Sequence, residues 1–487
     1  MERAYSFQMT PNLDSDMSVI VETFNFKNSK FLKLIFFLAL AVVGFRALAQ
    51  QKNSKPNILV IMTDQQTAEA MSAAGNKYLK TPAMDKLAKN GVRFTKAYCA
   101  QPLCTPSRSS IFSGKMPHET GFVGNAPEKD GQWPDSLLMM GEIFKNGGYQ
   151  TGYVGKWHLP VPTSKVGQHG FKYIENTNFL DYNDAATPSF CAGFIKENKD
   201  KPFLLVASFL NPHDICEWAR GEILKMDVIS NAPPVAECPP LPSNWRIPEL
   251  EPKIVRDQQK TVGLRTYPSV GWTGDQWRQY RWAYNRLVEK VDSYIEMLLG
   301  SLQKYGVEKN TIIIFTADHG DGYAGHSWNQ KQILYEESAK VPFIISKMDG
   351  SMKARTDDML VCNGVDMIPT ICGLAAVEKP GYLKGIDLSK RLIKPNVSLR
   401  DTLVIETEFA DNEELLGISG RAVITKDFKY IVYNKGLLRE QLFDLKKDPG
   451  EMNNLIKENA SKNNLFKMRS YLKQWCAKNG DKFNSGL

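Results

Sequence analysis

Pro102-Leu-Cys-Thr-Pro-Ser-Arg-Ser-Ser-Ile-Phe-Ser-Gly114 is the stretch around which the rest of the sequence is organised. Pro106 can occupy the first turn of a helix at no hydrogen-bond cost, which places Cys104 at the positive end of that helix. Arg108 lies one helical turn after Cys104, so its guanidinium can reach the same point. A buried structural thiol is the alternative for a lone cysteine. The nucleophile, the anion-binding helix start and the fixed cation together favour a catalytic role for Cys104.

A strand-like run precedes this stretch and is followed by two polar residues. Asn57–Met62 is a continuous apolar run, which is typical of a strand buried on both faces of a parallel sheet. Asp64 and Gln65 come directly after it. Because open α/β sheets bind their ligands outside the carboxyl ends of the strands, both residues are candidates for a functional site. A capping role is the alternative for Asp64.

Three further strand-like runs are followed by polar residues in the same way. They are Tyr149–Val154, followed by Lys156 and His158; Pro202–Leu210, followed by His213; and Thr311–Thr316, followed by Asp318 and His319. Lys156 and His158 are two residues apart, so at a strand end they point to the same face. The sequence therefore predicts that these side chains lie together. A surface position is the alternative for Lys156 and His158, and a structural histidine is the alternative for His213.

The remaining periodicity predicts further helices and strands. The predicted helices are Thr81–Val92, Ser136–Asn146 and Trp282–Tyr305, and the further predicted strands are Val92–Tyr98, Val341–Ile345, Arg400–Glu408, Gly420–Tyr433 and Glu440–Leu445. The pattern changes after about Leu388, where short strands of antiparallel type precede a final helix. Between Ile215 and about Gln276 the sequence lacks sustained periodicity, which predicts a long binding loop. Its residues Trp218, Trp245 and Trp272 either stack on sugar rings or pack this loop onto the body.

The amino terminus predicts export. Lys27, Lys30 and Lys33 precede the apolar run Leu34–Gly44, which is short for a membrane span, and Ala47-Leu-Ala49 is a small-x-small cleavage site. A membrane anchor is the alternative, but we expect cleavage near Ala49 and a periplasmic or secreted protein without a stable anchor. The sequence thus divides into an extension with a signal peptide at 1–49, a catalytic α/β domain at 50–387 and a smaller antiparallel-sheet subdomain at 388–487.

Composition narrows the classes of function. The net charge is +8, but the basic residues are scattered, with no arginine-rich arm and no zinc-finger spacing, so nucleic-acid binding is not expected. Eight cysteines are sparse and have no zinc-site spacing. One disulfide in an exported protein, for example between Cys216 and Cys238, stays open.

Two stretches now identify a resemblance. Cys-Thr-Pro-Ser-Arg with the following Ser-Ser-Ile-Phe-Ser-Gly, and the block Gly152-Tyr-Val-Gly-Lys-Trp-His158, resemble the two signatures of the formylglycine-dependent (type I) sulfatases. These enzymes belong to the alkaline-phosphatase-like superfamily, and the resemblance extends from about Pro56 to Leu455. It implies an α/β fold with a mixed, mostly parallel sheet flanked by helices. It also implies a smaller carboxyl-terminal α+β subdomain with an antiparallel sheet and a helix.

The resemblance also implies the chemistry at Cys104. A formylglycine-generating or sulfatase-maturating enzyme would oxidise Cys104 to formylglycine, whose hydrated form attacks the sulfur of a sulfate ester. The implied metal ligands are Asp64, Gln65, Asp318 and His319, together with residue 104. Most relatives have a second Asp at the position of Gln65, and many have Asn at that of His319. The oxygen-rich set favours Ca²⁺, our expected ion, or Mg²⁺, whereas His319 extends the choice to Mn²⁺.

Further roles follow from the same resemblance. The predicted catalytic residues are Cys104, Arg108, Lys156, His158, His213 and Lys331, and the predicted substrate-binding residues are Lys156, His213, His326 and Lys331. Three of these are cations, which would offset the charge of a sulfate ester. His213, with Lys331, is the candidate acid for the leaving alcohol, and His158 is the candidate base that regenerates the aldehyde. For His326 a structural role is the alternative.

The function predicted from these observations is that of an exported sulfatase that hydrolyses O-sulfate groups of sulfated carbohydrates. A phosphonate monoester hydrolase or phosphodiesterase of the same superfamily is one alternative, because those enzymes resemble this chain at Gln65 and His319. A catalytically silent protein that binds sulfated glycans is the other alternative, and it requires an unconverted Cys104.

Overall fold

Strand β1 (Asn57–Thr63) sends alternate side chains into two hydrophobic layers, and every residue of the strand is buried. Leu59 and Ile61 contact one layer, whereas Ile58 and Val60 contact the other. This is the pattern expected of a central strand that is covered on both faces. The computed structural model describes residues 55–126, 132–177, 183–224, 228–411 and 414–486.

The main sheet is mixed and mostly parallel, as the sequence predicts. Besides β1 it contains β2 (Gly91–Tyr98), β3 (Gln150–Gly155), β4 (Tyr173–Glu175), β5 (Phe203–Ser208), β6 (Thr311–Ala317), β7 (Phe343–Lys347) and β8 (Arg355–Cys362). The strands lie in the order β4-β3-β5-β1-β6-β7-β2-β8. Strand β7 is antiparallel to both of its neighbours, and the other described pairs are parallel. The carboxyl ends of β3, β5, β1 and β6 are therefore adjacent.

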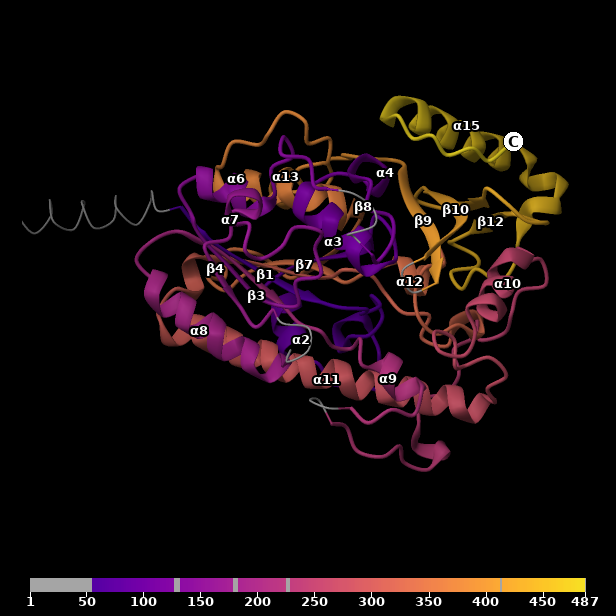
Figure 1. Ribbon diagram of the computed structural model, residues 1–487, viewed down its shortest axis with the longest axis horizontal. Coiled ribbons are helices and arrows are strands. Elements are labelled where there is room, and N and C mark those ends of the chain that lie inside the picture. Colours follow the sequence, from indigo (N-terminus) through magenta and orange to yellow (C-terminus); the bar gives the residue numbers. More distant parts are fainter. Residues whose placement is uncertain (1–54, 127–131, 178–182, 225–227, 412–413, 487) are drawn as a thin grey trace, which may run out of the picture. The chain divides into compact units, whose positions relative to one another are not determined.

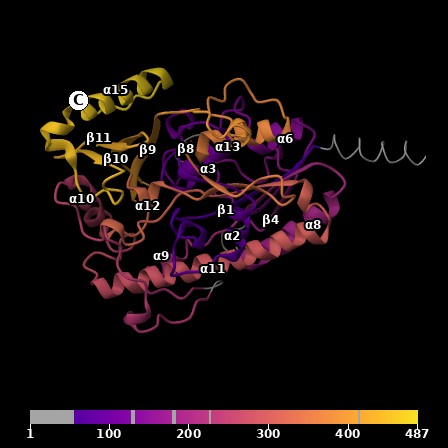
Figure 2. The same cartoon turned by 180° about the vertical axis from the view of Figure 1, so that it is seen from behind.

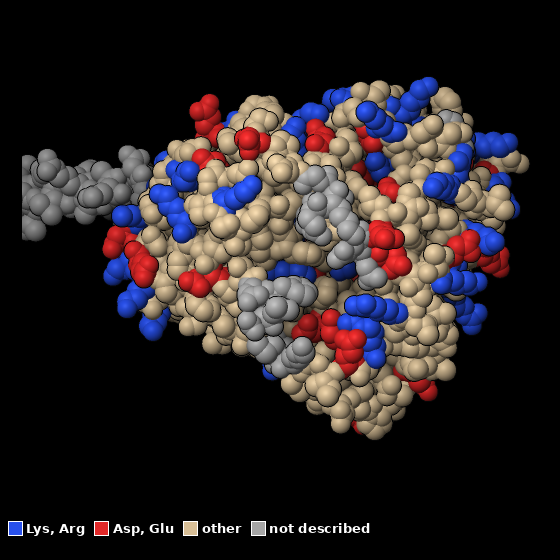
Figure 3. All heavy atoms as spheres, viewed as in Figure 1, with Lys and Arg blue, Asp and Glu red and all other residues tan. Residues whose placement is uncertain are grey.

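Helices cover both faces of this sheet (Figures 1 and 2). One face carries α3 (Cys104–Ser113), α4 (Pro117–Thr120), α6 (Met140–Asn146), α7 (Val166–His169) and α13 (Asn363–Ala375), and the other carries α2 (Pro82–Lys89), α8 (Thr187–Asn198), α9 (Ile215–Ala219) and α11 (Gly274–Lys304). Further short helices are α10 (Lys253–Val262), α12 (Glu336–Ala339) and α14 (Ser389–Ile393). Lys and Arg side chains are spread among Asp and Glu over the face that Figure 3 shows, as expected from their scatter along the sequence.

A smaller antiparallel sheet follows in the order β12-β11-β10-β9. Its strands are β9 (Leu403–Asp411), β10 (Glu414–Ile424), β11 (Phe428–Tyr433) and β12 (Glu440–Asp444), and the helix α15 (Lys462–Asn479) packs on it through Met468 and Leu472. Ile405 and Phe409 join a hydrophobic cluster that also contains Tyr98 of the main sheet. Residues 55–487 form one compact unit, and the boundary at residue 388 stays a prediction.

Helix α11 is longer than predicted. It begins at Gly274 instead of Trp282, because Thr273 and Gln276 form a capping box ahead of the apolar pattern. The backbone amide of Thr273 donates to Gln276 Oε1 at 2.9 Å, and that of Gln276 donates to Thr273 Oγ1 at 3.4 Å. Such caps satisfy amides that have no partner within the helix.

Other boundaries also differ from the predictions. The predicted helix 81–92 ends at Lys89, because Gly91 begins β2, where a Cβ atom would lie 2.2 Å from the carbonyl oxygen of Ile345. The predicted helix 136–146 begins at Met140, and the predicted strand 420–433 is a hairpin of two strands. Strand β8 and helix α13 were not predicted. Pro369 lies inside α13, and a proline within a periodic pattern argues against a helix.

The segment 215–276 is less irregular than predicted, because it contains α9 and α10. Trp218, Trp245 and Trp272 are half-buried and pack against the core, which supports the packing alternative over sugar stacking. The rings of Trp272 and Trp277, for example, lie 5.3 Å apart in an edge-to-face arrangement. The disulfide left open by the sequence is not formed, since all eight cysteines are free thiols.

The predicted signal peptide at 1–49 lies outside the described residues. Within the described part of the chain, none of the helices combines the length and the hydrophobicity that a membrane span requires.

A carboxylate of α11 caps helix α2. Asp292 is buried and accepts hydrogen bonds from the backbone amides of Ala83 and Met84, at 3.0 Å and 2.9 Å. Thr81, which precedes the helix, makes no capping hydrogen bond with its side chain. The first turn of α2 thus depends on a residue that is distant in the sequence.

We predict that Asp292→Ala lowers the free energy of unfolding by about 1–3 kcal/mol, because two buried amides lose a charged acceptor. Urea denaturation of the full chain measures this loss. Glu296→Ala, at an exposed position one turn further along α11, is the matched control and should change stability by less than about 0.5 kcal/mol. Equal effects of the two substitutions would contradict the capping role.

Candidate active site

Helix α3 begins at Cys104, as predicted, and all of its residues are buried. Helix α13 packs closely against it, and this close packing requires a residue without a Cβ atom at position 364. A Cβ atom at Gly364 would lie 2.8 Å from Ser110 Cβ and 2.9 Å from Ala100 Cβ. The close packing fixes α3 on the sheet, and it thereby fixes the side chain at position 104.

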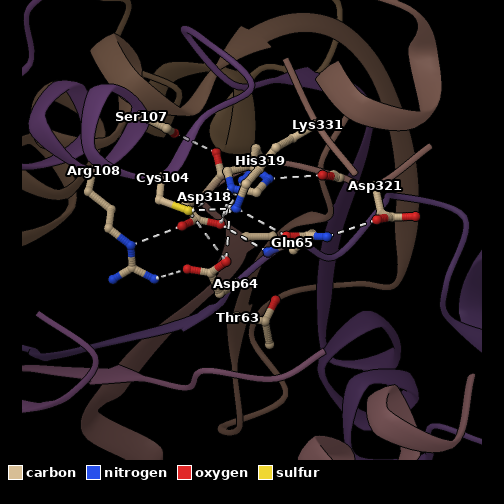
Figure 4. Close-up of polar contacts among 12 residues, drawn as sticks. Thr63, Asp64, Gln65, Cys104, Ser107, Arg108, Asp318, His319, Asp321 and Lys331 are labelled. Atoms are coloured by element: carbon tan, nitrogen blue, oxygen red, sulfur yellow. Dashed lines mark hydrogen bonds and ion pairs between the residues drawn. The ribbon is translucent and has the colours of Figure 1, made fainter. Parts of the chain in front are cut away.

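The structure brings Cys104 together with residues that follow strands β1 and β6 (Figure 4). Cys104 Sγ lies 2.9 Å from Lys331 Nζ, 3.2 Å from His319 Nε2 and 3.8 Å from Asp64 Oδ1. Asp318 Oδ1 in turn lies 3.8 Å from His319 Nε2. These side chains come from distant parts of the sequence and meet at the carboxyl edge of the sheet, where open α/β sheets bind ligands.

Arg108 connects the carboxyl ends of four adjacent strands. Its Nη2 donates to Asp64, which follows β1, and its Nε donates to Asp318, which follows β6, both at 2.9 Å. Its Nη1 donates to the carbonyl of Lys156, which follows β3, at 2.8 Å and to the hydroxyl of Ser208, which ends β5, at 3.0 Å. Because Arg108 is fully buried, these contacts compensate for its desolvation. A guanidinium can do this from one fixed plane, which an ammonium group cannot.

Lysines add further positive charge at the same point. Lys156 Nζ lies 2.7 Å from Asp64 Oδ2, and both side chains are buried. Lys331 Nζ donates to Gln65 Oε1 at 3.1 Å and contacts Cys104, and within the described part of the chain it has no carboxylate within ion-pair distance. Burial of an uncompensated ammonium is costly, so Lys331 indicates an anionic ligand at this point.

The charges around Cys104 change the pKa of its thiol. Burial and the charge of Asp64 oppose its ionisation, but Lys331 and Lys156 hold its pKa well below the ordinary value. A negative charge at position 104 is therefore stabilised.

The two carboxylates next to Cys104 differ in their pKa values. Burial opposes ionisation of Asp64, but Lys156 and other nearby cations hold its pKa well below the ordinary value. Burial and the charge of Asp64 raise the pKa of Asp318 to about 6. The pKa of His319 is raised, because the charge of Asp318 outweighs the effect of burial. A bound cation would relieve the repulsion between the two carboxylates.

The donor set fits a divalent metal. Ligand atoms of Asp64, Cys104, Asp318 and His319 all lie within 4.8 Å of one another, and all four residues are buried. Two carboxylates and an imidazole suit several divalent ions, so the geometry does not select one. Gln65, the remaining predicted ligand, donates from Nε2 to Asp321 at 2.8 Å, which directs its Oε1 toward Lys331. Its role as a ligand stays a prediction.

The two predicted acid–base histidines lie at the same site. His158 Nδ1 is buried without a hydrogen-bond partner, and burial lowers the pKa of its imidazole, helped by the charge of Lys156. His213 is half-buried, and burial together with Lys156 and Lys331 lowers its pKa. Both imidazoles are therefore neutral near pH 7 when no anion is bound.

Backbone strain marks the same region. Gln65 and His158 follow β1 and β3 with φ values of 66° and 45°, in the left-handed region that non-glycine residues rarely adopt. The loop that carries Lys331 is similar: residues with positive φ there are Tyr323, Ala324, His326, Ser327, Gln330 and Gln332. Such strain is typical of segments that position functional groups.

His326 lies apart from this cluster in its contacts. Its ring stacks on Tyr335 with the centroids 3.9 Å apart, and its Nε2 lies 3.4 Å from the carbonyl of Glu451. Its Nδ1 lies 3.7 Å from Glu337. These contacts favour the structural alternative, and the predicted contact of His326 with substrate stays a prediction.

The sequence did not indicate the residues that hold Gln65 in place by hydrogen bonds. Asp321 accepts from Gln65 and from Tyr280, whose hydroxyl lies 2.8 Å from its nearer oxygen. Tyr284 donates to the carbonyl of Gln65 at 2.6 Å. The one available signal is that Asp321 closes the stretch Asp318-His-Gly-Asp321, whereas the tyrosines of α11 look like ordinary core residues.

Comparisons with known proteins agree on one family. Residues 56–377 match the family model Sulfatase, and residues 324–478 match the model N-sulphoglucosamine sulphohydrolase, C-terminal. The chain is 30% identical over 466 residues to the Delta 4,5-hexuronate-2-O-sulfatase of Bacteroides thetaiotaomicron, covering 92% of this chain and 94% of that protein. It is 30% identical over 454 residues to the Ulvan-active sulfatase of Formosa agariphila, covering 90% and 84%. The solved structure of a 2-O GAG sulfatase superposes with a TM-score of 0.74 at 28% identity, over 88% of this chain and 93% of that one.

We predict that the full chain binds one divalent cation and that Asp64→Ala weakens this binding by more than about 100-fold. Loss of a residue that only contacts a metal ligand typically lowers metal affinity by about 10–100-fold, and loss of a ligand itself should lower it further. Calorimetric titration with Ca²⁺, Mg²⁺ and Mn²⁺ measures the affinity independently of turnover. Asp357→Asn is the control. It neutralises a carboxylate on β8 that pairs with Arg391 of α14, and the variant should bind the ion normally. Unchanged affinity in Asp64→Ala would exclude the cluster as the metal site.

Proposed function

The chain belongs to the sulfatase family of the alkaline-phosphatase-like fold and is a sulfuric ester hydrolase, and on this basis we propose that it is exported and removes O-sulfate groups from sulfated carbohydrates. The reaction would use a divalent metal and a formylglycine made from Cys104 by a maturating enzyme. We propose as catalytic residues Arg108, Lys156, His158, His213 and Lys331, and as metal ligands Asp64, Gln65, Asp318, His319 and residue 104.

One observation carries this proposal: once residue 104 is an uncharged formylglycine in place of an ionisable thiol, positive charge exceeds negative charge around it. Three buried cations, Arg108, Lys156 and Lys331, face the two carboxylates Asp64 and Asp318. Lys331 has no carboxylate partner among the described residues. An anionic ester would balance this charge and would be held next to residue 104.

The protein's own residues would position the reactants. When present, a divalent ion would stabilise negative charge on a sulfate oxygen, and the hydrated aldehyde at position 104 would supply the attacking oxygen. Arg108 would hold Asp64 and Asp318 in place for the metal. Lys156 and Lys331 would hold sulfate oxygens beside residue 104 and stabilise charge as it moves to the leaving oxygen.

The two histidines would move the protons. In the empty site, Lys156 and Lys331 depress the pKa of His213. The negative charge of a bound ester opposes this effect and favours the imidazolium that an acid for the leaving alcohol must be. His158 has a buried, unpartnered Nδ1 and a lowered pKa, which suits a neutral base. We assign to it the deprotonation that regenerates the aldehyde.

The carbohydrate part of the proposal is supported by two relatives. One is named for a sulfated hexuronate and the other for ulvan. Export is supported by the basic and apolar residues that precede Ala49. A carbohydrate polymer is too large to enter most cells, so its hydrolysis requires an exported enzyme or prior cleavage.

We predict that Cys104→Ser loses activity toward an aryl sulfate by on the order of 10⁴-fold or more in a host that cannot oxidise serine, a loss typical of removing a nucleophile. Steady-state kinetics measure the activity, and circular dichroism checks the fold. Cys476→Ser, which changes a half-buried thiol of α15, is the control and should stay active. Near-normal turnover by Cys104→Ser would contradict the proposed mechanism.

We further predict that the enzyme releases sulfate from one member of a panel of sulfated mono- and disaccharides, including a 2-O-sulfated unsaturated hexuronate and glucosamine 6-sulfate. Ion chromatography measures the released sulfate. An aryl phosphonate in the same panel tests the phosphonate alternative. A higher kcat/KM for the phosphonate than for every sulfate ester would replace the sulfatase proposal by that alternative.

A further inference from the structure

A cavity lies among helix α11, helix α12 and the segment near residue 450, and none of the catalytic or metal-binding candidates lines it. Its volume is about 510 Å³, which is within the range of small-molecule sites. The residues that matter for its chemistry are Asn244, Arg281, Tyr323, Glu337, Lys340 and Pro449.

Arg281 is the unusual group in this cavity. Its side chain comes from α11 and is only 9% exposed. Its guanidinium lies 4.5 Å above the ring of Tyr323, and its Nη1 donates to the carbonyl of Pro240. Its Nε is buried without a hydrogen-bond partner, and among the residues that the structure describes no carboxylate forms an ion pair with it. Because an unpaired buried cation is costly, Arg281 indicates a missing anion.

The neighbouring charges do not supply that anion. Lys340 lies 3.1 Å from Glu69 and 3.9 Å from Glu336, so these groups compensate for one another. Glu337 accepts a hydrogen bond from Asn244 at 2.6 Å. Its other oxygen, Oε2, lies 3.7 Å from Nδ1 of His326. Lys96 also lines the cavity and donates to the carbonyl of Lys426, and no carboxylate among the described residues forms an ion pair with it. The cavity therefore offers two cations, Arg281 and Lys96, that have no carboxylate partner.

We propose that this cavity is a binding site for an acidic sugar, whose carboxylate or sulfate binds Arg281 and whose hydroxyl groups bind Asn244. A guanidinium suits the paired oxygens that a carboxylate or a sulfate presents. The side-chain amide of Asn244 suits hydroxyl groups, which sugars provide in number. Pro449 adds apolar surface for a sugar ring. The site is independent of residue 104, so it would bind saccharide without hydrolysing it.

Arg278, a neighbour on the same helix, distinguishes a purely structural role of Arg281 from a role in binding. Arg278 also binds backbone carbonyls of the segment before residue 241, those of Ala236, Cys238 and Pro239. It does not line the cavity. If Arg281 only fastens this segment, loss of either arginine should have the same effect.

The test is calorimetric titration of the full-length Cys104→Ser protein with D-glucuronate, glucose 6-sulfate and uncharged D-glucose. We expect Arg281→Met to weaken binding of an acidic sugar by about 10–100-fold, the range for loss of a charge-assisted hydrogen bond. Arg278→Met should bind it as the parent protein does. Binding of glucuronate alone, glucose 6-sulfate alone or both supports the site and identifies the acidic group.

A second variant tests the site in case Arg281→Met does not fold. Ser243 is exposed at the rim of the cavity, so Ser243→Trp should block binding while leaving Arg281 in place. The proposal is overturned if neither acidic sugar binds the parent protein, if glucose binds equally well, or if Arg281→Met and Arg278→Met behave alike while Ser243→Trp binds normally. Activity of the Cys104-containing enzyme is a separate readout, so failure here leaves the sulfatase proposal intact.

Discussion

The site depends on the burial of one guanidinium at the meeting point of four strands. Arg108 donates to Asp64 and Asp318, to the carbonyl of Lys156 and to Ser208. These partners end or follow β6, β1, β3 and β5, so a single side chain is hydrogen-bonded to all four strand ends. Removing the guanidinium would leave two buried carboxylates without a cation, which is more costly than the pairing itself is favourable. We infer that Arg108 is required for the arrangement of the site before it contributes to any reaction.

Two buried cations of the structure lack a carboxylate partner among the described residues. These are Lys331 at Cys104 and Arg281 in the separate cavity. A folded chain tolerates such groups where a ligand completes the charge balance. At Cys104 the complement that we propose is an anionic ester next to a metal. In the cavity the complement that we propose is the acidic group of a sugar. One enzyme would thus hold sulfated or carboxylated saccharide at two places by the same physical means.

Much of the fold and most of the site could be predicted from the sequence, because buried parallel strands leave continuous apolar runs. Asp64, Lys156, His213 and Asp318 each follow such a run, and the carboxyl ends of parallel strands share one edge. Strand β8 and helix α13 were missed, since two aspartates interrupt the apolar run of β8 and Pro369 interrupts α13. The lack of periodicity between Ile215 and Gln276 predicts a binding loop, but the tryptophans of this segment pack on the core. The support of Gln65 by Asp321 depends on contacts between distant segments, which no local pattern encodes.

The central claim is that residue 104 works as an aldehyde and not as a thiol, and the mass of one peptide tests it most directly. The measurement is mass spectrometry of the tryptic peptide that contains Cys104, from protein that turns over a sulfate ester and was made in a host with a maturating enzyme. We predict the mass of the formylglycine peptide or of its hydrate. A plain cysteine at position 104 throughout this active protein would contradict the account.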